Sequence, residues 1–195
     1  IEQNSNYAIA HLRLGVTLLQ VGDFDGAEPS FERAIELNRS NFEAYYYLGN
    51  VWLSRRKLDR AMALYEESLK YVLNFPEALY ALGSVHFRKG NMQQALTHFQ
   101  SVIELNQRHA DAYFSRAAIL AKRKQYSKAI DDYNRALSLY DQQLIRLGKS
   151  IADLDNRGLS KKADLERRRK IRIELSIERT LNLKMESEDL QLRGP

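Results

Sequence analysis

A period of 34 residues constrains this chain more than any other feature, because a fixed repeat of that length overrides any domain estimate made from chain length. Four rows align without insertion or deletion when they begin at Ala8, Phe42, Pro76 and Ala110. One column of small residues then contains Gly15, Gly49, Gly83 and Ala117, and another contains Ala27, Ala61, Ala95 and Ala129. A column of large residues contains Phe31, Tyr65, Phe99 and Tyr133. The chain therefore carries four tandem copies of one unit.

Each row has the pattern of two antiparallel helices. In the first row, one apolar run at helical spacing contains Leu14 and Leu18, and a second contains Phe31 and Ile35. Gly22 lies in the turn between them. Two helices approach closely only where small side chains meet, and large side chains fill the grooves beside them. Because one hairpin cannot bury its apolar face alone, the sequence predicts a stack of hairpins.

The second row resembles the tetratricopeptide repeat on the residues Tyr45, Leu48-Gly49, Trp52, Ala61 and Tyr65. This resemblance implies an all-α fold, a right-handed solenoid of helical hairpins with a C-terminal helical extension. After a lead-in at residues 1–7, the predicted repeats are 8–41, 42–75, 76–109 and 110–143. Two local features depart from the family pattern or add to it. Arg116 replaces the leucine of the fourth repeat, and Asp25 and Glu28 have the spacing of a capping box.

A helical extension is predicted to follow the repeats. Apolar residues alternate spacings of three and four from Leu137 to Leu154, so the last repeat helix is expected to continue to Asn156 as a coiled-coil seam. Gly158 then indicates a helix stop, and residues 144–186 form a basic helical extension or hairpin. The stretch 171–177 alternates with strand period, but its neighbours are strong helix formers, so we predict helix there. Residues 187–195 are predicted to be a frayed tail.

The resemblance also implies that the first helix of each repeat lines a concave wall. The predicted partner-binding residues on that wall are Leu12, Tyr46, Asn50, Leu53, Tyr80, Phe87, Arg88, Phe114 and Lys122. Large contiguous apolar patches usually mark binding sites, so we expect a partner helix or extended segment to lie in this aromatic groove. Two alternatives are that some of these side chains face the chain's own core, or that the C-terminal hairpin folds into the groove.

A strongly basic stretch gives a second candidate surface. The formal net charge is +5, and residues 161–172 carry seven basic side chains against two acidic ones. The basic residues are Lys161, Lys162, Arg167, Arg168, Arg169, Lys170 and Arg172. They can form a solvated helix face, bind an acidic protein or lipid surface, or serve a nucleic-acid-associated adaptor. Residues 141–195 contain no Phe, Trp or Tyr, which argues against nucleic acid. A further alternative is a structural subunit that self-associates through the 137–185 helices.

No pattern of an enzyme is present in the sequence. The chain has no cysteine, and none of its four histidines has a second histidine or a carboxylate four residues away. The adjacent carboxylates Asp131 and Asp132 are expected to meet solvent, and no glycine-rich phosphate loop occurs. We therefore predict no catalytic residues, no metal and no cofactor, and a non-catalytic protein-interaction scaffold, acting within a multiprotein assembly. The clamp with which some family members capture chaperone tails is absent, because Leu12, Val16, Glu77 and Ala81 occupy its positions.

The sequence constrains location only weakly. No apolar run approaches the roughly 20 residues that a bilayer span needs, and residues 1–7 have no targeting pattern. The chain begins with Ile1 rather than methionine, as expected of a processed or truncated form. We predict a cytoplasmic protein.

Overall fold

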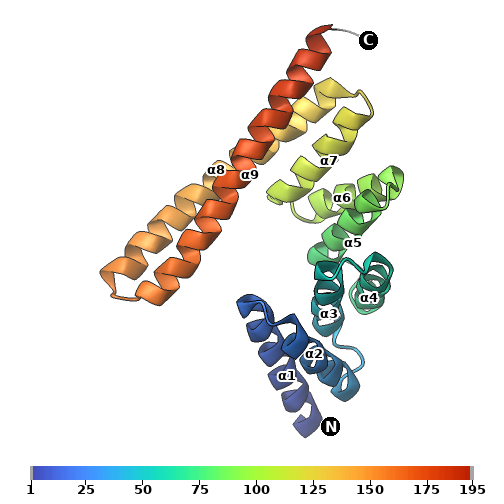
Figure 1. The fold of residues 1–195 in the computed structure, drawn as a ribbon, viewed down its shortest axis with the longest axis vertical. Helices are drawn as coiled ribbons and strands as arrows, with labels where there is room; N and C mark the ends of the chain where they lie inside the picture. The colour runs from blue at the N-terminus through green and yellow to red at the C-terminus, as the bar shows by residue number, and fades with distance from the viewer. Residues whose placement is uncertain (1, 194–195) are drawn as a thin grey trace. The chain divides into compact units, whose positions relative to one another are not determined.

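The computed structural model describes the backbone of residues 2–193 and the side chains of residues 6–193. Over these residues the secondary structure is entirely α-helical (Figure 1). The helices are α1 (Glu2–Val21), α2 (Phe24–Leu37), α3 (Phe42–Ser54), α4 (Leu58–Tyr71), α5 (Pro76–Arg88), α6 (Met92–Leu105), α7 (Ala110–Lys122), α8 (Tyr126–Asn156) and α9 (Ser160–Arg193). The alternating stretch 171–177 lies inside α9, so the prediction of helix there is confirmed.

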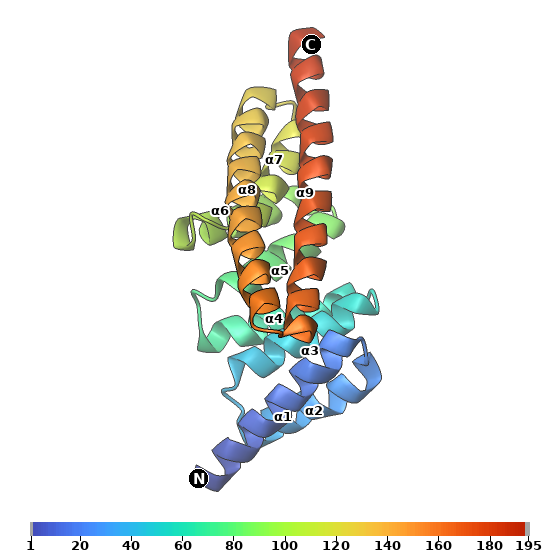
Figure 2. The same cartoon turned by 90° about the vertical axis from the view of Figure 1, so that its left-hand side faces the viewer.

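The helices are distributed over two compact units, Ile1–Ser101 and Val102–Pro195. In the first unit α1 packs on α2, α2 on α3, α3 on α4 and α4 on α5, so successive hairpins stack in chain order. In the second unit α7 packs on α8, and α8 and α9 lie side by side as a long antiparallel hairpin (Figures 1 and 2).

Aromatic rings packed on glycines hold together the two helices in each of the first three hairpins. In the first unit, a Cβ atom added to Gly49 would lie 2.5 Å from Cε1 of Tyr65, and one added to Gly15 would lie 2.6 Å from Cε1 of Phe31. Both rings are completely buried. The small column of the sequence is therefore required because each second helix lays a ring directly on the backbone of the first.

Replacing Gly49 by alanine is expected to lower the free energy of unfolding by about 1 to 3 kcal/mol, because the Tyr65 ring must move away from the new methyl group. Urea denaturation followed by circular dichroism measures this change. Gly148→Ala is the matched control, because nothing lies within 4 Å of a Cβ at that exposed helical position. The control should be neutral or stabilising by up to about 1 kcal/mol. Equal losses in the two variants would contradict the close contact.

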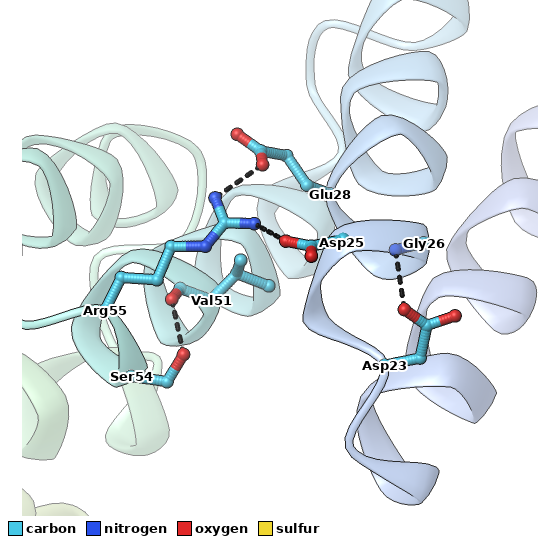
Figure 3. A network of polar contacts seen from close by, with 7 residues as sticks. All are labelled: Asp23, Asp25, Gly26, Glu28, Val51, Ser54 and Arg55. Atoms are coloured by element: carbon cyan, nitrogen blue, oxygen red, sulfur yellow. Dashed lines mark hydrogen bonds and ion pairs between the residues drawn. The ribbon is translucent and has the colours of Figure 1, made fainter.

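A polar network ties the start of α2 to the end of α3 (Figure 3). Asp23 caps α2, because its Oδ1 atom accepts a hydrogen bond from the Gly26 amide at 2.9 Å. The predicted capping box of Asp25 and Glu28 is wrong. Instead, both carboxylates bind the Arg55 guanidinium at 2.6 Å, so they join two successive hairpins rather than capping one helix.

The fourth repeat replaces an apolar contact by an ion pair. Arg116 donates two hydrogen bonds to the carboxylate of Asp132, from Nε to Oδ2 and from Nη2 to Oδ1, both at 2.7 Å. Asp132 is buried, so the expectation that it meets solvent is wrong, whereas Asp131 is exposed. The hydrogen bonds with Asp132 raise the pKa of Arg116 above its ordinary value, with burial acting in the opposite direction. The guanidinium therefore stays charged and paired.

The C-terminal hairpin is longer than predicted. α8 ends at Asn156 and Gly158 has a φ of +68°, as the turn prediction requires, but α9 continues to Arg193. The frayed tail is therefore wrong for residues 187–193, and residues 194–195 lie outside the described part. Ser187 is buried, seven residues after the buried Thr180, so the contact surface of α9 extends through small residues that an apolar pattern does not reveal.

Candidate partner-binding surfaces

A hydroxyl and amide cluster lies on α3 and α4 of the first unit. The Tyr65 hydroxyl on α4 donates a hydrogen bond to Oδ1 of Asn50 on α3 at 2.8 Å. The Tyr46 ring lies 6.0 Å from the Tyr65 ring and 5.2 Å from that of Phe75. Tyr46 and Asn50 are both half-buried, so their positions are held by packing while part of each remains accessible. Asn50 has two amide protons, which can donate to a carbonyl oxygen.

Burial and nearby charges act on the two tyrosine hydroxyls. Burial raises the pKa of both Tyr46 and Tyr65 above the ordinary value. A hydrogen bond with Asn50 opposes the increase in the pKa of Tyr46, the charge of Glu77 adds to it, and the charge of Arg88 opposes the increase in the pKa of Tyr65. Both hydroxyls therefore remain protonated at neutral pH and keep their donor protons. Both charged residues belong to α5.

Half-buried apolar side chains flank the cluster. Leu53 packs against the core cluster that contains Tyr65, Leu82 and Val85. Tyr80 lies with its ring 5.5 Å from Phe99, and Phe87 is also half-buried. We define the α3–α5 surface by these accessible side chains: Tyr46, Asn50, Leu53, Tyr80, Phe87 and Arg88.

Two of the predicted wall residues are occupied within the chain itself. Leu12 is only 8% exposed and packs in the core with Phe31 and Leu48, so its assignment to a binding wall is wrong. Phe114 on α7 packs on the same core cluster as Ile173 and Ile177 of α9, and the Arg179 guanidinium of α9 lies over its ring. At the fourth repeat, the alternative in which the C-terminal hairpin covers the first helix is therefore the arrangement found.

α9 also places charge over the covered face of α7. The Arg179 guanidinium lies 5.2 Å from the centre of the Phe114 ring, and Leu183 packs on the neighbouring cluster with Ala121. Lys122, the last residue of α7, remains exposed. Phe114 is therefore half-buried and partly covered by α9.

The basic residues of α9 differ in how they are neutralised. Arg167 pairs with Asp155 of α8 at 2.6 Å and with Asp164 at 2.7 Å. Arg169 pairs with Glu166, and Lys170 pairs more loosely with Glu174 at 3.8 Å. The remaining basic residues, which are exposed and form no ion pair within residues 6–193, are Lys161, Lys162, Arg168 and Arg172.

The predicted coiled-coil seam is used inside the chain. Tyr140 of α8 is buried and packs with Ile173 and Ile177 of α9. Leu147 and Ile173 line the same hollow between the two helices. Self-association through this seam would require the hairpin to open, because α9 already occupies it.

Two relationships were not predicted from the sequence. Tyr65 belongs to a packing column, but its hydroxyl also orients Asn50. His86 and His98 stack with ring centres 5.4 Å apart, and the pKa of each is lowered, chiefly by burial. The sequence gives only a weak signal for this histidine pair, because helical spacing relates residues within one helix and not residues of α5 to residues of α6.

Two further classes of site, metal centres and membrane-spanning helices, are absent from the part of the chain that the structure describes. No cluster of three or more His, Cys, Asp or Glu side chains suited to a metal occurs in residues 6–193. No helix among the described residues combines the length and apolarity needed to cross a membrane.

Comparison with known proteins gives a family match and several structural matches. A sequence model described as "Tetratricopeptide repeat" matches residues 12–71, 56–107 and 80–143. No curated protein sequence matches significantly. The structure of MamA is similar, with a TM-score of 0.62 and 22% identity over 89% of this chain and 94% of that one. YrrB, described as a TPR protein with an unusual peptide-binding site, has a TM-score of 0.62 and 23% identity over 95% of each chain.

A third match was solved with a ligand. The first TPR of Spaghetti, bound to the HSP90 peptide SRMEEVD, has a TM-score of 0.59 and 15% identity over 60% of this chain and 96% of that one. At these identities the matches establish the fold, an all-α helical-repeat solenoid.

Proposed function

The chain belongs to the tetratricopeptide repeat family, and from this premise we propose that it is a non-catalytic scaffold that binds a protein partner through its α3–α5 surface. Members of this family generally act as interaction scaffolds without chemistry of their own. We propose that the partner contributes an extended segment or a helix, and that binding takes place within a multiprotein assembly in the cytoplasm.

The observation that carries this proposal is the orientation of Asn50 by Tyr65. A hydrogen bond of 2.8 Å holds the amide oxygen of Asn50, so its amide protons have a fixed direction. A fixed donor beside half-buried rings is suited to a peptide backbone, because it can bind a carbonyl while the rings contact neighbouring side chains. YrrB, described as having a peptide-binding site, and the Spaghetti domain, solved with a bound peptide, support a partner of this class.

The positive charge of Arg88 further restricts the chemistry of the partner segment. Arg88 is exposed at the end of α5, and its charge acts on the Tyr65 hydroxyl. We expect a partner carboxylate to pair with Arg88 while apolar side chains contact Tyr80 and Phe87. The groove clamp for chaperone tails lacks its basic residues here, so we do not propose a chaperone tail as the partner.

Binding should depend on Tyr80, Phe87 and Arg88. Partners captured from source-cell lysate by the wild-type chain are identified, and the segment that binds is then measured in purified form by calorimetry. Tyr80→Ala/Phe87→Ala and Arg88→Glu should each weaken binding about tenfold or more, since buried aromatic and arginine contacts dominate interfaces. Circular dichroism and thermal melting confirm the fold of each variant.

Tyr71→Ala/Leu73→Ala is the matched control, because both side chains are large and exposed but lie outside the α3–α5 surface. It should keep full affinity. The proposal would be overturned if the partner bound Tyr80→Ala/Phe87→Ala and Arg88→Glu as tightly as it binds the wild type and the control. Retention of nucleic acid instead, with a steep loss in salt and no effect of Tyr80→Ala, would favour the nucleic-acid adaptor.

A further inference from the structure

One side of the α8–α9 hairpin, far along the chain from the α3–α5 surface, is almost entirely basic. Spacings of three and four residues place six residues of α9 on this side: Lys161, Lys162, Leu165, Arg168, Arg169 and Arg172. All six are exposed. The two carboxylates of this stretch, Asp164 and Glu166, lie on other sides of the helix, although Glu166 reaches round to pair with Arg169. The basic charge of this side is therefore largely uncompensated.

A hollow between α8 and α9 adjoins this basic side. It has a volume of about 360 Å³ and is lined by Gln143, Arg146, Leu147, Arg169, Arg172 and Ile173. Leu147 and Ile173 are half-buried and give it apolar walls, and the side chains of three arginines from two helices also line it. Arg146 and Arg172 form no ion pair within residues 6–193, so like charges face one hollow without a counter-charge.

We propose that this surface, the basic arm, binds an acidic amphipathic segment of a protein partner. An apolar side chain of the segment enters the hollow against Leu147 and Ile173. Carboxylates on either side of it pair with Arg146 and Arg172, because guanidinium groups bind carboxylates in a forked geometry. This site lies in the second unit and is independent of the α3–α5 surface.

The chemistry of the basic arm favours a protein segment over other anions. Single-stranded nucleic acid binds through stacking on aromatic rings as well as charge, and residues 141–195 contain no Phe, Trp or Tyr. An anionic membrane surface is bound by helices that insert several apolar side chains beside their basic ones. On α9, this side presents Leu165 as its one exposed apolar residue among the six.

The test uses the full chain and a defined probe. The probe is a fluorescein-labelled synthetic helical peptide of leucine and glutamate at amphipathic spacing, and its counterpart has glutamine in place of glutamate. Fluorescence anisotropy should show tighter binding of the glutamate peptide. Arg146→Glu/Arg172→Glu should weaken that binding at least about tenfold, because it replaces attraction by repulsion at the hollow. Both positions are exposed, so the fold is preserved.

Arg108→Glu/Lys128→Glu is the matched control. It changes the net charge equally at two exposed positions of the second unit away from the arm, and binding should stay within about twofold of wild type. Leu147→Ala, which alters no charge, should also weaken binding, because it removes one apolar wall of the hollow. The proposal is overturned if the glutamine peptide binds equally well, or if both double variants lose the same affinity. It is also overturned if phosphatidylserine vesicles or poly-uridine RNA bind more tightly than the glutamate peptide.

Discussion

Replacing Arg116 by leucine should lower the free energy of unfolding by about 3 kcal/mol or more, although leucine is the residue of the repeat pattern at this position. The loss is expected because Asp132, which is 7% exposed, would be left in a buried site without its partner. Both of its oxygens accept hydrogen bonds from Arg116, at 2.7 Å each. A buried ion pair contributes little relative to apolar packing, but half of one is strongly destabilising.

The second repeat supplies the matched compensation. Leu48 and Leu64 occupy the same two columns there and pack in one core cluster. The double variant Arg116→Leu/Asp132→Leu should therefore recover to within about 1 kcal/mol of the wild type. Urea denaturation measures the four chains of this cycle, and hydrogen exchange of α7 and α8 amides reports the second unit. Additive losses in the double variant would show that the two residues do not act as a pair.

Tyr65→Ala is expected to lower the free energy of unfolding of the first unit by about 3 to 5 kcal/mol. The ring is completely buried and lies on the backbone of Gly49, so its removal leaves a cavity between α3 and α4. It also releases Asn50, which loses the hydroxyl that orients it. Hydrogen exchange in α3 and α4 should increase most, while α8 and α9 should stay protected.

Tyr65→Phe separates the two roles of this side chain. The ring is retained, so stability should fall by only about 1 kcal/mol, the ordinary contribution of one hydrogen bond. Binding at the α3–α5 surface should nevertheless weaken, because the Asn50 amide is no longer held in one direction. If Tyr65→Phe instead costs as much stability as Tyr65→Ala, the hydroxyl rather than the ring stabilises the hairpin.

Much of the fold could be predicted because the repeat encodes it many times. The glycine and aromatic columns recur at one spacing. The contact between Gly49 and Tyr65 in the second repeat therefore has a counterpart in the first repeat, between Gly15 and Phe31. The turn at Gly158 was also predictable, because a left-handed φ of +68° favours glycine. Local chemistry of this kind is visible in a single sequence.

The sequence by itself determined the all-α repeat, its period, the helical hairpin after it and the clustering of basic residues on one stretch of α9. Tertiary structure alone decided that Leu12 is core, that Arg179 of α9 lies over Phe114, and that Asp132 pairs with Arg116. The reason is that helical periodicity specifies which residues share a face, whereas the neighbour that covers the face comes from another helix. The convergence of Arg146 with Arg172 on one hollow depends in the same way on the packing of α8 against α9.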